Sequence, residues 1–238
     1  MAPRGAQPPT VLGRDLAWRR GRRVFVKLLI VIVVLAALFE GADILSRHVA
    51  QDTIATRAVS ATSASSGSAS VSGWPFLVHL AGGNVQQLTV DLHSVPIGTL
   101  HVSELDIVLT GIGIDVHAVF ADRALRLTHI NSASVRAVVT AAELTAATGD
   151  PVTLRPDGSI EVTVAGTTVA AQVAIVDGHV MVLDYAGHQL LHVDMAQDRL
   201  VPDCTMNLAV TSQSVTTTCA VAPVPASILS ALSGAATS

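Results

Sequence analysis

Acidic side chains, histidines and cysteines are the residues whose chemistry could serve a reaction or hold a metal ion. Glu104 and Asp106 would share one face of a strand, but no basic or nucleophilic partner for them is evident in the sequence. His101 is three residues from Glu104, a spacing that places the two on opposite faces of a strand. The pattern therefore favours a solvated strand face over a general acid–base site.

The nine histidines are spread along the chain without a metal-binding pattern. His188 and His192 flank an apolar pair and are expected to face solvent. The motifs of serine hydrolases, P-loop proteins and zinc peptidases do not occur, and Gly111-Ile112-Gly113 lacks the rest of a dinucleotide fingerprint. The sequence therefore predicts no enzyme, no metal site and no cofactor. The histidines are His48, His79, His93, His101, His117, His129, His179, His188 and His192.

Cys204 and Cys219 are the two cysteines of the chain. If the body lies outside the cytoplasm, they are free to form a disulfide, which we favour over two free thiols. Closing a loop of about fifteen residues would stabilise the fold by about 3 kcal/mol in the chain-entropy model. Neither cysteine has histidine partners at ligand spacing, so a zinc site is not expected.

Composition limits the classes of function. Half of the residues are hydrophobic and 13% are charged, a high apolar fraction for a soluble domain. Seven of the fourteen basic residues lie within the first 27 positions, which leaves the rest of the chain acidic. An acidic body lacks the clustered positive charge of a nucleic-acid groove, so no nucleic-acid partner is expected. The apolar excess predicts either an unusually large core or an apolar surface for a ligand.

The N-terminal 40 residues have the pattern of a membrane segment. Residues 1–23 are polar and basic and predict a cytoplasmic tail, and residues 24–40 predict a transmembrane signal anchor. As a helix, 24–39 would span roughly 24 Å of the ~30 Å hydrocarbon core, and Lys27 could snorkel to the headgroups. The arginines at 19–23 predict a single-pass protein of the cell membrane with its body outside the cytoplasm. A cleaved signal peptide is the alternative, but no clear cleavage site follows.

Residues 41–72 predict an amphipathic helix followed by a spacer. Ser60–Ser70 has no large apolar residue and is interpreted as a flexible linker or a polar loop. Residues 73–238 then predict one β-rich domain packed with the helix of 41–59. The apolar positions of that helix, at roughly helical spacing, are Ile44, Leu45, Val49, Ile54 and Val59.

The pentapeptide Gly73-Trp74-Pro75-Phe76-Leu77 opens the β-rich region. Past the N-terminal fifth of the chain the aromatic residues are Trp74, Phe76, Phe120 and Tyr185, so this pentapeptide holds two of the four. Because aromatic side chains carry the largest apolar area, the pentapeptide is expected to anchor the fold.

From Val85 onward the apolar residues recur at every second position, which predicts strands. The apolar phase changes near Glu104 and near Gly111, so a bend or bulge is expected at both. Turn residues predict hairpins over 152–164, 169–183 and 204–219. Thr140 and Glu143 have the spacing of a capping box for a short helix over 140–148, and a closing helix is expected over 225–232. The predicted fold class is α+β, with a strongly bent antiparallel sheet wrapped on a helix.

A bent sheet rich in Val, Leu and Ile must cover its concave face with its own helices or with an acyl chain. Each methylene removed from water contributes about 0.8 kcal/mol, so even a partly covered tail would bind well. An ordinary closed core has the same pattern, and patterning alone does not choose between the two. The residues we propose for an apolar lipid site are Trp74, Phe76, Leu77, Leu88, Val90, Leu105, Ile107 and Leu109.

Three segments carry a family resemblance: GWPFLVHLAGGNVQQLTVDLHSVPIG at 73–98, LHVSELDIVLTGIGIDV at 100–116, and the late cysteine pair with VAPVPASIL at 221–229. Together they resemble the actinobacterial LmeA-type phospholipid-binding domain, over about 43–232. The resemblance implies an envelope protein that binds phospholipid, has a tubular, BPI-like lipid-binding fold and supports assembly of lipid-linked envelope glycans, with an envelope-biosynthesis enzyme as a candidate partner. It supplies no catalytic residues. The alternative is a structural or adaptor domain that partners a membrane enzyme.

Overall fold

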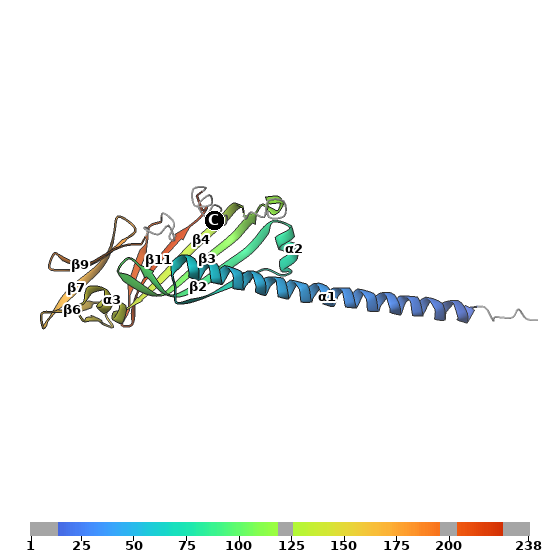
Figure 1. Cartoon of the computed structure of the whole chain (residues 1–238), viewed down its shortest axis with the longest axis horizontal. Helices are drawn as coiled ribbons and strands as arrows, with labels where there is room; N and C mark the ends of the chain where they lie inside the picture. Colours follow the sequence, from blue (N-terminus) through green and yellow to red (C-terminus); the bar gives the residue numbers. More distant parts are fainter. Residues whose placement is uncertain (1–13, 119–125, 196–203, 226–238) are drawn as a thin grey trace, which may run out of the picture. The chain divides into compact units, whose positions relative to one another are not determined.

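The structure, a computed structural model, describes residues 14–118, 126–195 and 204–225 (Figure 1), and it describes side chains from residue 33 onward. The chain consists of two compact units, residues 1–45 and 46–238. Helix α1 (Arg14–Thr62) begins in the first unit and ends in the second. No helix in the described part of the chain has the length and hydropathy that a bilayer crossing requires. The membrane segment at 24–40 stays a prediction.

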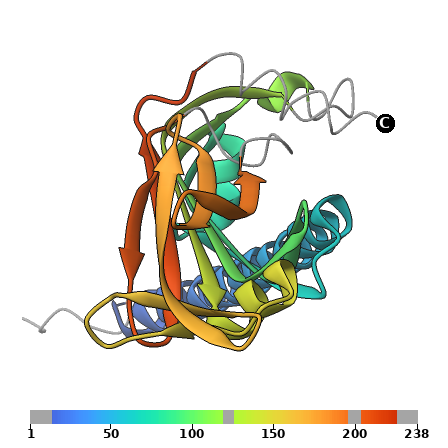
Figure 2. The same cartoon turned by 90° about the vertical axis from the view of Figure 1, so that its left-hand side faces the viewer.

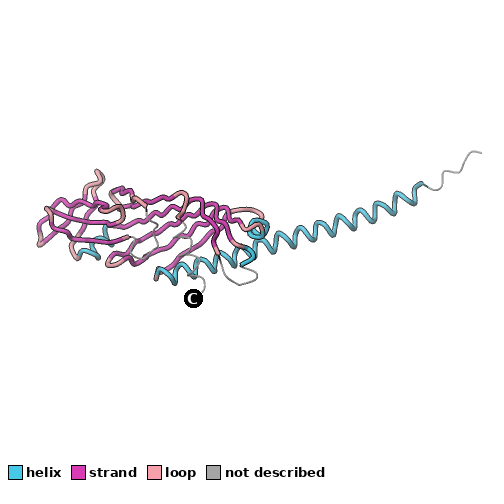
Figure 3. The backbone as a smooth tube through the Cα atoms, turned by 90° about the horizontal axis from the view of Figure 1, so that it is seen from above, coloured by secondary structure: helices cyan, strands magenta, loops and turns pink. Residues whose placement is uncertain are grey.

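The second unit is rich in antiparallel strands (Figure 3), and the larger of its two sheets has six of them. The three central strands of this sheet are long and lie next to one another in sequence order. Short strands β1 and β10 form its two edges. In spatial order the strands are β1 (Ser66–Ser72), β2 (Asn84–Ile97), β3 (Leu100–Ile114), β4 (Leu127–Thr140), β11 (Ser214–Val221) and β10 (Asn207–Val210).

A five-stranded antiparallel sheet lies at the end of this unit that carries α3 (Figure 2). Two of the three predicted hairpins belong to it, and all three are confirmed. The turn at Asp157 is held by the N–H and hydroxyl of Ser159, which donate to the Asp157 carboxylate and lower its pKa. The strands are β5 (Val152–Leu154), β6 (Ile160–Val164), β7 (Thr167–Val176), β8 (Val180–Tyr185) and β9 (His188–Asp194).

Two short helices connect these strands. Helix α2 (Phe76–Ala81) begins at Phe76 of the pentapeptide, and helix α3 (Ala141–Thr148) links the two sheets. The capping box predicted for α3 is present: the Thr140 hydroxyl accepts from the Glu143 N–H, and the Glu143 carboxylate accepts from the Thr140 N–H. Gly149, at φ +81°, ends the helix in the left-handed conformation. The predicted closing helix at 225–232 and Phe120 lie outside the described residues, except for Pro225.

The α+β class with antiparallel strands is confirmed, but the strands divide into two sheets where one bent sheet was predicted. The prediction of a flexible linker or polar loop over Ser60–Ser70 was also wrong. Residues 60–62 end α1, and residues 66–72 form edge strand β1. Small residues are needed there because α1 passes close to the strand. A Cβ on Gly67 would lie 2.5 Å from Leu92 Cδ2 and 2.9 Å from Val59 Cγ2.

The hairpin β2–β3 changes its buried face twice along its length. Val85 and Ile112 form a buried pair, Leu92 and Leu105 another, and Val95 and Val102 a third. Between successive pairs the buried positions switch between odd and even numbers in both strands, so the pairing register is unchanged. The phase changes predicted near Glu104 and Gly111 are thus present. Gly111 has φ +60°, and Ser94 has φ +52° at the other switch.

The buried apolar residues form two clusters. The main cluster spans both sheets and includes Leu92, Leu105, Leu144, Val162 and Leu183. The second, which we call the α2-end cluster, consists of Val71, Phe76, Val85, Ile112, Ile130, Ala133 and Val224. The disulfide Cys204–Cys219, predicted from the sequence, joins β11 to the segment before β10, and Cys219 lies in the main cluster.

Candidate lipid-binding face of the six-stranded sheet

One face of the six-stranded sheet, here called the inner face, carries continuous rows of apolar side chains. Antiparallel pairing sets Leu88 beside Leu109, and Val90 beside Ile107. Val135 of β4 continues the second row. Because directly opposed residues on neighbouring strands point to the same face, these side chains form one aliphatic surface across three strands.

Three side chains in the middle of the inner face are only half-buried, whereas Val90 and Val135 in the same rows are buried. Leu88, Ile107 and Leu109 are of intermediate exposure, whereas the side chains further along both strands are closed into the two clusters. Leu88 packs against both clusters and therefore lies at their junction. We call Leu88, Ile107 and Leu109 the aliphatic strip. It is a stretch of apolar surface that the described chain does not fully cover.

The last turns of α1 lie against this face. Ile54 packs against both clusters, and Ala58 and Val59 pack against the main cluster. Arg47, which precedes these residues in α1, donates from Nη2 to the Gly73 carbonyl at 2.7 Å. Among the apolar positions predicted for this helix, Ile44, Leu45 and Val49 are instead more than half exposed. The helix thus contributes through small and β-branched residues near its C-terminal end.

The residues proposed for the lipid site fall into three groups. Phe76, Val90 and Leu105 are buried in the clusters. Leu77 is half-buried, as are the residues of the aliphatic strip, and it packs against the α2-end cluster. Trp74, by contrast, is 69% exposed, so the expectation that the pentapeptide anchors the fold holds for Phe76 and is wrong for Trp74.

The opposite, outer face of the sheet is polar. Asp91 and Asp106 lie opposite each other on β2 and β3. Arg136 of β4 donates from Nη1 to Asp106 Oδ2 at 3.1 Å, and Thr110 and Ser132 share a hydrogen bond on the same face. The sequence interpretation that Asp106 lacks a basic partner was wrong, because the partner comes from a neighbouring strand thirty positions later.

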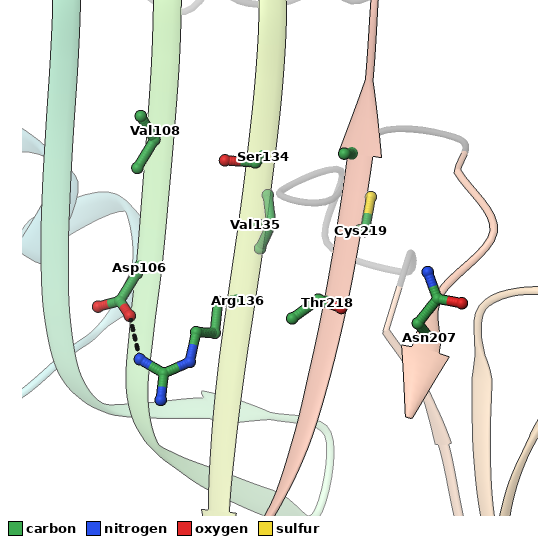
Figure 4. Close-up of a pocket in the computed structure, with 9 residues that line it drawn as sticks. Asp106, Val108, Ser134, Val135, Arg136, Asn207, Thr218 and Cys219 are labelled. Atoms are coloured by element: carbon green, nitrogen blue, oxygen red, sulfur yellow. Dashed lines mark hydrogen bonds and ion pairs between the residues drawn. The ribbon is translucent and has the colours of Figure 1, made fainter. Parts of the chain in front are cut away.

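A hollow of about 330 Å³ lies on this outer face (Figure 4). The Asp106–Arg136 ion pair borders it, and neither residue is buried. None of the residues proposed for the lipid site lines it. It is lined by Asp106, Val108, Ser134, Val135, Arg136, Asn207, Thr218, Cys219 and Ala220, of which Val135 and Cys219 also belong to the main cluster.

The histidine and carboxylate side chains of the described residues are scattered over the structure. His101, His188 and His192 are exposed, and among the residues that the structure describes no three His, Cys, Asp or Glu side chains gather as metal ligands would. Sequence analysis missed Ala58, Val135 and Arg47 as parts of the inner face and its helix. The four-residue spacing of Ile54 and Ala58 was the one local signal available for the helix.

Comparison with known proteins identifies one family. A sequence model of the LmeA-like phospholipid-binding family matches residues 41–237, which is most of the chain. No curated protein matches this chain significantly, and no solved structure does so either.

Proposed function

Because the chain belongs to the LmeA-like phospholipid-binding family, we propose that it holds phospholipid acyl chains against the inner face of the six-stranded sheet. The family match supports a lipid-binding protein. The observation that supports this face is the half-buried aliphatic strip between two closed clusters. A hydrocarbon tail on Leu88, Ile107 and Leu109 would remove apolar surface from water on both partners, at about 0.8 kcal/mol per methylene.

The polar outer face makes the alternative location less favourable for a tail. Its hollow is bordered by the Asp106–Arg136 ion pair, and an acyl chain laid there would separate these charges from water without pairing them better. The inner face has no such charge in its rows. We therefore assign tail binding to the inner face alone.

Several features support a place in the cell envelope. The basic residues 1–23 and the apolar segment 24–40 favour a single-pass anchor with the body outside the cytoplasm. The disulfide Cys204–Cys219 is typical of a protein that folds in an oxidising compartment. We propose that the protein serves there as a non-catalytic, membrane-anchored lipid-binding protein that supports assembly of lipid-linked envelope glycans, with an envelope-biosynthesis enzyme as its partner.

Mass spectrometry of co-purified phospholipid tests the assignment of the face. The full chain is purified in detergent, and bound phospholipid per protein is compared between L88N/L109N and T89N/V108N. These two variants alter directly paired positions one residue apart, on the inner and the outer face of the same hairpin. Both keep the N-terminal segment, so lipid held there cancels in the comparison.

We expect the inner-face variant to lose phospholipid and the outer-face variant to keep it. Equal lipid content in both variants, at the level of the unaltered protein, would exclude the inner face as the binding site. Absence of phospholipid from the unaltered protein would instead favour the structural or adaptor role.

A further inference from the structure

The largest aromatic side chain of the second unit lies outside its core. Trp74 is 69% exposed, and Val78, four residues further on in α2, is 54% exposed. Val49 of α1 is also exposed, and its neighbour two residues earlier, Arg47, bonds to the carbonyl that precedes Trp74. A tryptophan with an apolar body and a polar N–H is the side chain enriched at membrane–water interfaces.

This segment lies at the end of the unit where the chain arrives from the N-terminus. The apolar run ends at Phe39, and the second unit begins at Ser46. Seven helical residues cover only roughly 10 Å, so a bilayer that held 24–39 would lie within a short reach of Arg47 and Gly73. The Arg47–Gly73 hydrogen bond keeps the pentapeptide beside this point of entry.

Charge distinguishes this end from the far one. The segment 141–195, which forms α3 and the five-stranded sheet, has a single basic residue, Arg155, against seven acidic ones. An anionic bilayer would repel that end. At the α2 end the described charges are mixed: Asp43 and Asp52 lie within five positions of Arg47 in α1, and the Asp115 N–H donates to the Arg126 carbonyl. The acidic residues of 141–195 are Glu143, Asp150, Asp157, Glu161, Asp177, Asp184 and Asp194.

We propose that the α2 end is a membrane-docking surface, with Trp74 and Val78 seated in the headgroup region of a phospholipid bilayer. This inference rests on the proposed membrane anchoring and adds the surface by which the body meets the lipid. Docking places α2 and its buried Phe76 between the bilayer and the inner face of the sheet. A tail leaving the bilayer would then pass the α2-end cluster to reach Leu88 and Leu109.

Tryptophan fluorescence of the full chain in vesicles tests this proposal. The chain has two tryptophans, so W18F leaves Trp74 as the reporter. The protein is reconstituted into vesicles of phosphatidylcholine and phosphatidylglycerol, with and without brominated phosphatidylcholine. Bromine in both leaflets makes the readout independent of protein orientation. We expect Trp74 emission to shift to the blue in vesicles and to be quenched by the brominated lipid.

The matched control moves the same fluorophore to the far sheet. W18F/W74F/V176W places an indole at Val176 of β7, itself 45% exposed, where we expect no quenching. T153W on β5 replaces this control if circular dichroism shows that V176W does not fold. Trp74 emission that stays water-like and unquenched would overturn the docking surface, and equal quenching at both sites would do the same. If phospholipid still co-purifies in either case, the proposed function survives while the docking surface does not.

Discussion

The two sheets bury their apolar residues to different extents. In the five-stranded sheet Val162 of β6 and Met181 and Leu183 of β8 have no exposed surface, although Val173 and Ile175 of β7 are half-buried. In the middle of the six-stranded sheet the corresponding positions Leu88, Ile107 and Leu109 stay half-buried. Strands of similar composition can therefore form a closed core in one sheet and an aliphatic strip in the other. The difference supports the proposed lipid site on the six-stranded sheet more directly than composition does.

Removing a leucine from each sheet tests that contrast most strongly. L183A should lower the free energy of unfolding by about 2–5 kcal/mol, because a fully buried leucine leaves a cavity. L109A should cost only about 1 kcal/mol, because a partly exposed leucine loses less buried surface when it is truncated. Urea denaturation of the detergent-solubilised full chain measures both. Equal losses would mean that the strip is as closed as the five-stranded sheet.

Removal of the disulfide should cause the next largest loss of stability. Replacing both cysteines, as C204A/C219A, should cost about 3 kcal/mol, because the loop of fifteen residues regains entropy in the unfolded chain. The same urea titration, run on the unaltered protein with and without reductant, gives an independent value. Phospholipid content should stay unchanged, since neither sulfur belongs to the aliphatic strip. Loss of lipid without loss of stability would place Cys219 in the binding site.

A smaller effect is expected where α1 approaches the edge strand. G67A should cost about 1–3 kcal/mol, because the new methyl would overlap the side chains of Leu92 and Val59. S70A on the same strand is the control and should be near neutral. Thermal unfolding followed by circular dichroism compares them. A neutral G67A would show that the helix is not held closely against β1.

The smallest effect should come from the outer face. D106N breaks an exposed ion pair with Arg136, and it also removes the charge facing Asp91 across the strands. Such surface pairs contribute about 0–1 kcal/mol, so stability should change little. Lipid content by mass spectrometry should equal that of the unaltered protein. A fall in bound lipid would move the binding site to the outer face and its hollow.

Local signals in the sequence predicted the elements better than their packing. The α3 capping box, the turns at Asp157 and Asp177, and the phase changes along β3 are encoded within a few residues, and each was predicted. The spacer was misjudged because the need for small residues at Gly67 arises from α1, which packs there only in the folded chain. Trp74 was misplaced for a similar reason, since an apolar side chain does not reveal by itself whether protein or lipid will cover it.

The unchanged register of β2 and β3 limits how this hairpin can vary in length. In both strands the buried side chains change face at the same paired positions, near Ser94 and near Gly111. Adding or deleting one residue in either strand would turn every later side chain to the wrong side while its partner kept the original frame. Length changes are therefore tolerable only at the tip around Gly98, or as matched insertions in the two strands. The two strands of this hairpin can therefore gain or lose residues only as a pair.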